Sequence, residues 1–291
     1  MAKDPTRKRR KKVSRFAMTW HQLKKNKLAM VCLAVLICLV LIAVFAKYLA
    51  PYSYEVADKT RVLEGPSKEH LLGTDRMGRD MLSRLIYGTQ QSLSMGIFAI
   101  VISAVVGILL GSIAGYFGGW VDNLIMRLLD IYQSIPMMLL CITFAAVLGP
   151  SLRNAIIAIG ISMVPGYARM MRASILTVRD NEYIDAARMC NCTNRQIILS
   201  HIIPNAISPL IVTITMSIGG AVLSGAGLSF IGLGVQSPIA EWGAMISDGR
   251  NFMRTNPTLS LYPGLCIMIT VLAFNLLGDG LRDALDPRLK N

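Results

Sequence analysis

The chain alternates long apolar runs with shorter polar connections, a pattern typical of a protein that crosses a lipid bilayer several times. The runs have the length that a membrane-spanning helix needs, about 20 residues. Six spans are predicted, at residues 28–46, 92–117, 131–148, 154–170, 206–234 and 261–277. Pro136 is expected to kink the third span, and Pro165 with Gly166 to break the fourth, which is the weakest. The pattern predicts an all-α polytopic membrane protein with six transmembrane helices.

Three glycines mark one face of the second span. Gly107, Gly111 and Gly115 recur at every fourth residue. Small residues at this spacing let a second helix approach closely within lipid. We therefore expect this stripe to be a helix-packing surface.

The first span follows a basic arm that extends from Lys3 to Lys27. Basic residues ahead of an apolar run are the usual cytoplasmic flank of a membrane helix. Phe16, Trp20 and Leu23 recur there at helical spacing, which predicts a short interfacial helix after a disordered start. The first span exceeds the roughly 7–15 apolar residues of a signal peptide, so an uncleaved helix is expected.

Composition agrees with a membrane protein and argues against a nucleic-acid partner. Of the residues, 53% are hydrophobic and 16% are charged, whereas soluble domains carry about a quarter charged residues. The net charge of +13 comes mainly from the arm, and no basic patch interleaved with aromatic residues follows it. The Lys and Arg asymmetry between loops places both termini in the cytoplasm.

The sequence offers no metal, nucleotide or catalytic site. Cys190 and Cys192 have no matching pair elsewhere, and His21, His70 and His201 are far apart. No Walker-type phosphate-binding loop, Ser-His-Asp set or carboxylate pair is apparent. Any energy from nucleotide hydrolysis must therefore come from another subunit.

A few polar residues lie in or beside the spans. Asp130 is expected to pair with Arg127 on the same helix face rather than to contact substrate. Gln133 and Asn275 could line a polar pathway or bond neighbouring helices, and helix packing is favoured.

Residues 172–204 are too polar to enter lipid and lie on the predicted cytoplasmic side. Ala186, Ala187 and Met189 favour a first short helix, which Asn191 can end in the left-handed conformation. A second helical run follows until Pro204, where the next span is expected to begin. Two short helices across the membrane face are predicted.

This segment resembles the "EAA" loop of ABC importer permeases, E-A-A-x-x-x-G followed after nine residues by I-x-L-P. The chain has D-A-A-R-M-C-N from Asp185 and H-I-I-P from His201. It departs from the pattern at four positions: Asp185 for Glu, Asn191 for Gly, His201 for Ile and Ile203 for Leu. The resemblance implies an ATPase-coupling loop that contains Glu182, Asp185, Ala186, Ala187, Asn191, His201 and Pro204. The acidic groups of Glu182 and Asp185 could meet the ATPase, or pair with Arg179 and Arg188.

Three further stretches are similar to the second permease of dipeptide and oligopeptide importers. They are G-T-D-R-M-G-R-D at 73–80 with Ser83 and Arg84, L-S-F-I-G-L-G at 228–234 with Trp242 and Gly243, and L-R-D-A-L-D-P-R at 281–288. The four motifs occur in the family's order. The resemblance thus covers nearly the whole chain beyond the arm.

The resemblance implies a type I ABC importer permease in a bacterial plasma membrane, working by alternating access. The implied partners are a second homologous permease, two ABC ATPases that bind ATP and Mg²⁺, and an extracytoplasmic substrate-binding protein. The chain itself would need no cofactor. The expected parts are a basic arm and interfacial helix at 1–27, a first membrane helix at 28–50, an external loop at 51–91, a five-helix core at 92–280 with the coupling loop 172–204, and a cytoplasmic end at 281–291.

Three other functions stay open. The first is a permease for nickel or another metal chelate. The second is an ion-driven secondary transporter, for which deep charges or inverted repeats would be expected and are not evident. The third is a structural membrane scaffold, which would leave the cytoplasmic two-helix loop unexplained.

Overall fold

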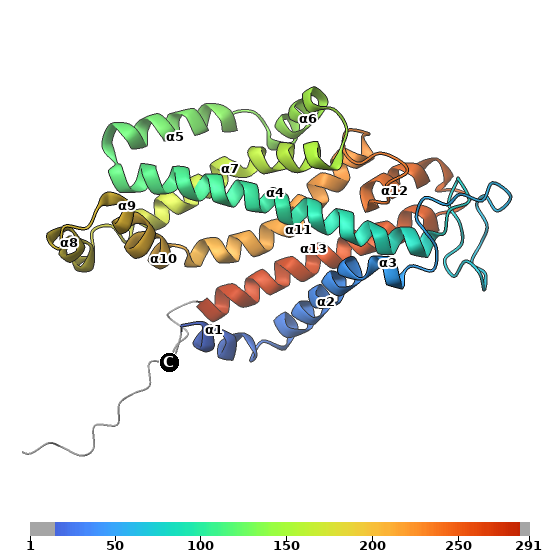
Figure 1. Cartoon of the computed structure of the whole chain (residues 1–291), viewed down its shortest axis with the longest axis horizontal. Helices are drawn as coiled ribbons and strands as arrows, with labels where there is room; N and C mark the ends of the chain where they lie inside the picture. The colour runs from blue at the N-terminus through green and yellow to red at the C-terminus, as the bar shows by residue number, and fades with distance from the viewer. Residues whose placement is uncertain (1–14, 286–291) are drawn as a thin grey trace, which may run out of the picture.

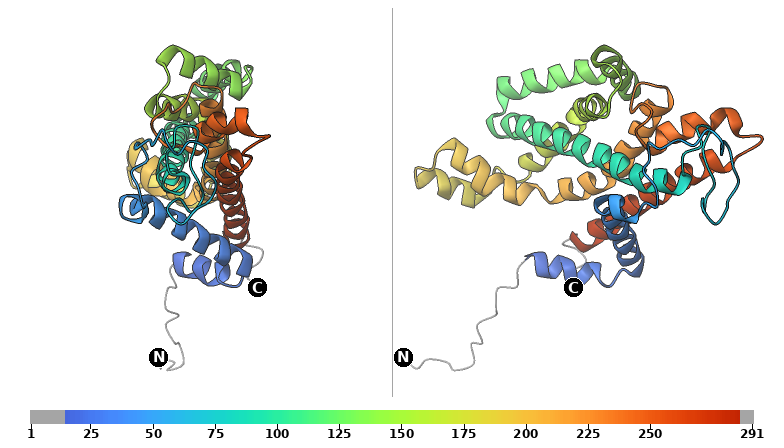
Figure 2. Two further views of the ribbon diagram at one scale, coloured as in Figure 1. Left: turned by 90° about the vertical axis from the view of Figure 1, so that its right-hand side faces the viewer. Right: turned by 45° about the vertical axis from the view of Figure 1, so that its right-hand side comes forward.

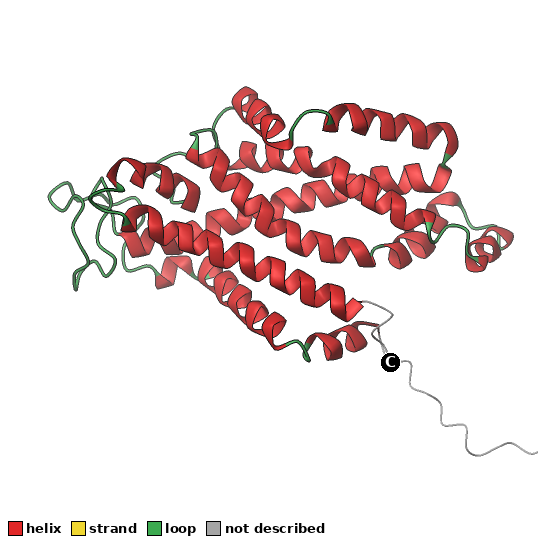
Figure 3. Cartoon of the chain, turned by 180° about the vertical axis from the view of Figure 1, so that it is seen from behind, coloured by secondary structure: helices red, strands yellow, loops and turns green. Residues whose placement is uncertain are grey.

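The computed structural model describes residues 15–285, and its regular elements are all helical (Figure 3). The rest of the basic arm, 1–14, and the end of the chain, 286–291, lie outside the described residues. The α-helices are α1 Arg15–Leu23, α2 Lys27–Val44, α3 Ala46–Leu49, α4 Met81–Phe117, α5 Gly119–Gln133, α6 Met137–Leu148, α7 Leu152–Leu176, α8 Glu182–Met189, α9 Asn194–Gln196, α10 Ile203–Ala206, α11 Ser208–Phe230, α12 Trp242–Gly249 and α13 Thr258–Leu285. A π-helix, Ile197–Ile202, joins α9 to α10, and a 3-10 helix, Arg250–Phe252, follows α12.

Four of the described helices, α2, α4, α11 and α13, are long and apolar enough to cross a bilayer. The pair α5 and α6 makes a fifth candidate if its two parts count as one span, although they are bent by 83°. The remaining predicted span, α7, does not meet the same test of composition. Its 25 residues still reach about 37 Å, the length of a full crossing.

Helix α4 begins at Met81 and not at residue 92, so the preceding loop is shorter than predicted. Asp80 caps the helix, since its Oδ2 accepts hydrogen bonds from the Ser83 amide and hydroxyl at 2.7 Å each. The first turns of α4 are polar but buried. The apolar pattern missed them because protein, and not lipid, surrounds them.

The third predicted span is divided rather than kinked. Residues 134–136 separate α5 from α6, and Pro136 directly precedes α6. Proline has no amide hydrogen to continue the helical ladder, which explains the position of the break. At the start of α5, Gly118 and Gly119 have φ of 64° and 53°. Such values favour glycine, and they let the chain reverse directly from α4 into α5.

The predicted break in the fourth span is wrong. Helix α7 continues from Leu152 to Leu176 with Pro165 inside it. Its long contact with α4 supports the backbone on both sides of the proline. Neighbouring helices can in this way stabilise a helix that contains proline.

Helix α4 lies at the centre of the bundle, with α7 and α11 packed along it (Figure 1). Gly107, Gly111 and Gly115 face α7. A Cβ at Gly111 would lie 2.3 Å from the Ala168 carbonyl oxygen, so the two backbones are in direct contact there. The end-on view in Figure 2 shows α2 and α13 on one side of α4, and α5 and α6 on the other.

The two ends of the bundle carry different structures. Helices α8, α9 and α10 project from one end, and the loop before α4 lies with α12 at the opposite end (Figures 1 and 2). The predicted N-terminal helix is present as α1, where Trp20 is exposed and Leu23 is buried against α13. The side chain of Phe16 lies outside the described part.

Candidate functional site

The end that carries α8 has a hydrophobic core of its own. Ile184, Ala187, Ile197 and Ile202 pack together with Met171 and Ile175 of α7 and with Leu210 of α11. Both α7 and α11 are therefore packed directly against the projecting segment. A displacement of α8 would be transmitted to these two helices, because the core between them is close-packed.

A glycine-like turn ends α8. Asn191 has φ of 58°, the left-handed value expected for it. Its amide donates to the Arg188 carbonyl at 3.0 Å, and the Cys192 amide donates to the Ala187 carbonyl at 3.1 Å. This pair of bonds is the Schellman motif, which satisfies carbonyls at a helix C-terminus. Asparagine thus provides the turn for which the resembling pattern uses glycine.

Three exposed residues of α8 are acidic or small. Glu182, Asp185 and Ala186 are exposed there, whereas Ala187 is only 8% exposed. Asp185 pairs with Arg188 at 3.0 Å on the surface. Arg179 pairs with Asp180 and not with Glu182. Of the two alanines that the sequence assigns to a partner contact, only Ala186 is free to make one, because Ala187 faces the chain's own core.

The second half of the segment is irregular. Thr193 and Gln196 form a capping box at α9, and the Ile203 amide donates to the Ile198 carbonyl in the π-helix. Such π-turns often occur at functional sites. His201 is half-buried, and Pro204 is exposed in α10. The prediction that Pro204 begins the next span is wrong, since α11 begins at Ser208.

A cavity of about 480 Å³ lies between the α5–α6 bend, the middle of α7 and the middle of α11. This volume lies within the usual range of small-ligand sites. Its polar lining consists of Tyr132, Gln133, Ser162, Tyr167, Thr213 and Ser217. Methionine, leucine, isoleucine, proline and glycine complete the wall, and the described lining has no charged side chain. Gln133 thus lines a cavity, whereas Asn275 is not among the residues around it.

Ion pairs join α5 to α7 on the side of this cavity nearer α8. Arg172 binds Asp122 with two hydrogen bonds of 2.5 Å, and Arg169 binds Asp130 at 2.7 Å. The predicted pair of Asp130 with Arg127 is therefore wrong. The partner comes from a different helix, which a rule based on spacing along one helix cannot identify.

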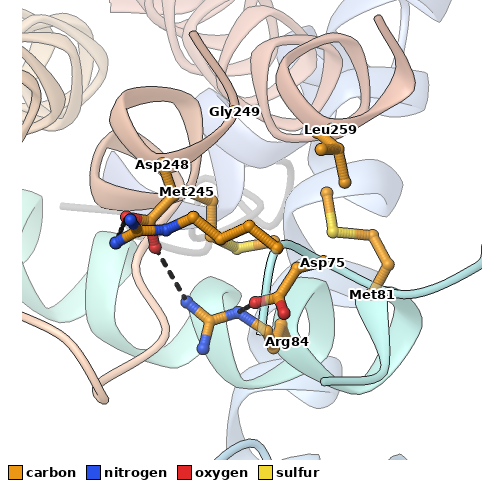
Figure 4. A pocket seen from close by; sticks show the side chains of 8 residues that line it. Asp75, Met81, Arg84, Met245, Asp248, Gly249 and Leu259 are labelled. Atoms are coloured by element: carbon orange, nitrogen blue, oxygen red, sulfur yellow. Dashed lines mark hydrogen bonds and ion pairs between the residues drawn. The ribbon is translucent and has the colours of Figure 1, made fainter. Parts of the chain in front are cut away.

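The opposite end of the bundle holds a buried ionic cluster (Figure 4). Asp75 binds Arg79 at 2.7 Å and lies 3.4 Å from Arg84. Asp248, at the end of α12, binds Arg76 at 2.7 Å and lies 3.4 Å from Arg79. The Arg79 and Arg84 side chains are only 1% exposed. The cluster joins the loop before α4 to α12. The Arg84 guanidinium lies between the Asp75 carboxylate of the loop and the Asp248 carboxylate of α12.

A further buried acid caps the start of α12. Glu241 is fully buried at the start of α12 and accepts hydrogen bonds from the Gly243 and Ala244 amides at 2.9 Å each. The Ser92 hydroxyl of α4 also donates to it, at 3.0 Å. Burial raises the pKa of the Glu241 carboxyl, although these hydrogen bonds partly oppose the shift.

The described residues contain no group of three or more His, Cys, Asp or Glu placed to hold a metal ion. In particular, Cys190 is exposed and Cys192 is half-buried at the end of α8, both as free thiols.

Family models match this architecture over most of the chain. The model described as "Binding-protein-dependent transport system inner membrane component" matches residues 107–291, which is more than half of the sequence. The model "N-terminal TM domain of oligopeptide transport permease C" matches residues 14–66. The chain belongs to this transport family. It is accordingly a multi-pass membrane permease component of an ABC transporter.

Several named permeases are similar over nearly their full length. The dipeptide transport system permease protein DppC of Alkalihalophilus pseudofirmus is 47% identical over 96% of this chain and 92% of the relative. The glutathione transport system permease protein GsiD of Escherichia coli O157:H7 is 44% identical over 93% of this chain and 90% of the relative. The permease thus has full-length relatives among peptide transport systems.

Solved structures support the same fold at lower identity. A chain of the inward-facing MetNI methionine ABC transporter aligns with a TM-score of 0.57 at 22% identity, covering 71% of this permease and 98% of that chain. A chain of an amino acid ABC transporter crystallised with histidines gives a TM-score of 0.54 at 17% identity, covering 68% and 92%. The prediction of an ABC importer permease fold is confirmed.

The sequence identified the α8 segment of the permease but, apart from Gln133, not the cavity residues or the outer cluster. Tyr132, Ser162 and Tyr167 read as ordinary residues of apolar spans. The useful signal was Ser162, Pro165 and Tyr167 close together in the middle of one span, where polar groups need a partner. Asp75 and Arg84 were noted only as part of a motif, and nothing in the sequence connects them to Asp248.

Proposed function

We propose that this permease forms half of the translocation pathway of an ATP-driven importer of dipeptides or oligopeptides. Its partners are a second homologous permease, two ATPase subunits that bind ATP and Mg²⁺ and carry out all hydrolysis, and an extracytoplasmic substrate-binding protein. The permease has no enzymatic activity of its own. Similarity to dipeptide and glutathione permeases supports the peptide class.

The observation that carries the proposal is the outer face of α8. Glu182, Asp185 and Ala186 are exposed on a short helix whose other side is buried in the permease. Such a surface suits a groove in a rigid partner, because docking it does not require the segment to reorganise. The acidic groups favour basic residues on the ATPase.

Helices α7 and α11 connect the core beneath α8 to the cavity. Met171 and Ile175 of α7 belong to the core beneath α8, and Met170 and Tyr167 of the same helix line the cavity. Leu210 and Thr213 make the same connection through α11. Closure of the ATPases would therefore shift two cavity walls together. This is the rigid coupling that alternating access between two conformations requires.

The proposal includes an orientation. The end with α8 faces the cytoplasm, as do both termini, and the loop before α4 faces outward with α12. The excess of Lys and Arg in the basic arm supports this orientation. The outer end is then the surface available to the binding protein.

Reconstitution tests the function. The permease, its co-encoded partners and the binding protein are placed in proteoliposomes, and uptake of radiolabelled dialanine and of nickel–histidine chelate is measured. We expect dialanine uptake that requires ATP and the binding protein. Uptake of the chelate alone, or peptide uptake without ATP, would refute the proposal.

A further inference from the structure

Three lysines lie around the turn between α1 and α2. Lys24, Lys25 and Lys27 are exposed, and no ion pair joins any of them to a carboxylate of the described residues. The turn itself is ordered, since the amides of Lys24 and Lys25 donate to the Trp20 and Gln22 carbonyls at 3.1 and 3.0 Å. The three ammonium groups thus stand on a backbone that is held in place, and we call them the lysine surface.

Helix α13 sets the position of this turn at the edge of the bundle (Figures 1 and 2). A Cβ built on Gly280 of α13 would lie 2.4 Å from the Ala29 Cβ and 3.4 Å from the Leu23 Cδ1. Asn26 caps α2, because its Oδ1 accepts a hydrogen bond from the Ala29 amide at 3.1 Å. The buried side of the turn therefore packs on α13, and the lysine surface is left on the outside.

Helix α2 shows where the lipid tails begin. It is a candidate membrane span from Lys27 to Val44, of which only 17% is buried in the bundle. Leu28 and Val31 are 55% and 60% exposed, so the helix presents an apolar surface from its first turn. The lysine surface directly precedes this apolar surface. Its ammonium groups therefore lie at the level of the headgroups that border the tails.

Trp20 adds a second feature of a membrane interface. It is 37% exposed, and the Lys24 Nζ lies 5.3 Å from the centroid of its ring, within the range of a cation–π contact. Tryptophan is enriched at the membrane–water interface, where its amphipathic ring sits among the headgroups. The ring favours this region for any lipid, whereas the lysines favour lipids that carry a negative charge.

From these observations we propose that the lysine surface binds the headgroups of anionic phospholipids. Clusters of basic residues beside a membrane helix attract such lipids, and the unbroken basic run at residues 7–12 adds to the positive charge ahead of α1. Lipid is favoured over an acidic protein because the lysines adjoin a helix whose exposed side chains need lipid around them. In the proposed orientation, the lipids belong to the cytoplasmic leaflet. The contact holds α1, and through it the end of α13, at the membrane surface.

Local photo-crosslinking tests the proposal. The photoreactive residue p-benzoylphenylalanine replaces His21, which is exposed on α1, and the purified complex is placed in liposomes of equimolar phosphatidylglycerol and phosphatidylcholine. After irradiation, mass spectrometry of the permease counts each cross-linked lipid. We expect phosphatidylglycerol to be favoured about fivefold or more, the effect of at least one ammonium group near an anionic surface.

Two triple variants identify the source of the preference. Lys24→Gln/Lys25→Gln/Lys27→Gln should bring the ratio of the two lipids close to one. Lys24→Arg/Lys25→Arg/Lys27→Arg keeps the charge and should keep the ratio. The same probe at Tyr48 is the matched control, because this residue is 83% exposed in α3, at the opposite end of α2. The ratio at Tyr48 should be the same with and without the lysine substitutions.

Equal cross-linking of the two lipids at position 21, with all three lysines present, overturns the proposal. A ratio that the glutamine substitutions leave unchanged also overturns it. Cross-links to another protein subunit in place of lipid overturn it too, and would assign the surface to an acidic protein. The first of these measurements is decisive even if a triple variant destabilises the complex. No transported peptide is needed, so the result is independent of the proposed function.

Discussion

Gly107 lies directly against Tyr167. A Cβ built on Gly107 would stand 2.4 Å from the Tyr167 Cβ, so α4 and α7 touch at a residue that also lines the cavity. The glycine stripe therefore determines how close the cavity wall lies to the central helix. Packing within the bundle and the shape of the cavity depend on the same contact.

The first prediction concerns this contact. Gly111→Leu should destabilise the permease, because its Cβ would lie 2.3 Å from the Ala168 carbonyl oxygen and 2.8 Å from the Met171 Cβ. Overpacking of this kind costs about 1–3 kcal/mol, and a backbone contact leaves little room for relief. Thermal unfolding of the purified complex measures the effect. Gly264→Leu serves as the control, and an equal Tm for the two variants would contradict the packing role.

The glycine spacing could be interpreted from the sequence because close helix contact in lipid needs small residues at a fixed interval. The cavity could not be predicted from the sequence, since it depends on the 83° bend between α5 and α6. Pro136 indicated a kink at this position but not its angle. The continuity of α7 through Pro165 was also hidden, because neighbouring helices and not local preference decide it.

The α8 segment illustrates the same limit at finer scale. The residue types were enough to predict the motif and a turn at Asn191. The φ of 58° at Asn191 confirms the predicted left-handed conformation. Which of two adjacent alanines faces outward depends on how α8 sits against Ile197 and Ile202. The sequence treats Ala186 and Ala187 alike, whereas the structure gives them different roles.

The second prediction separates these two alanines. Ala186→Glu should leave the amount and Tm of the permease unchanged but weaken ATPase retention, because the new charge meets a packed interface. Ala187→Glu should instead lower the stability of the permease by a few kcal/mol, since its charge enters the core beneath α8. Co-purification of the ATPases and thermal unfolding of the permease measure the two effects. Full ATPase retention by Ala186→Glu would remove α8 as the docking helix.

The third prediction concerns the outer cluster. Asp75→Asn should destabilise the link between the loop before α4 and α12, since Arg79 and Arg84 remain buried with less compensating charge. Breaking a buried ion pair costs about 3–5 kcal/mol. Limited proteolysis of the loop and thermal unfolding measure the loss. Asp58→Asn is the control, because its exposed pair with Arg61 is worth about 1 kcal/mol or less. Equal effects of both variants would mean that the cluster does not hold this end together.

The last prediction uses pH. Burial raises the pKa of Glu241 in the folded permease, whereas an unfolded glutamate titrates near an ordinary value of about 4.3. The folded state therefore holds a proton at pH values where the unfolded chain has released it. The stability that this proton provides is fully present below the ordinary pKa and is lost as pH rises through the raised pKa.

Glu241→Gln removes this titration while keeping a side chain of similar size. The Tm of the variant minus that of the wild type should rise with pH across that window. Taking the difference cancels other titrating groups, and the partners of Glu241, the Ser92 hydroxyl and two backbone amides, carry no charge. Thermal unfolding of both proteins from pH 4 to pH 9 supplies the data. Parallel curves would mean that the hydrogen bonds cancel the effect of burial on the pKa of Glu241, and a difference that falls with pH would mean that they outweigh it.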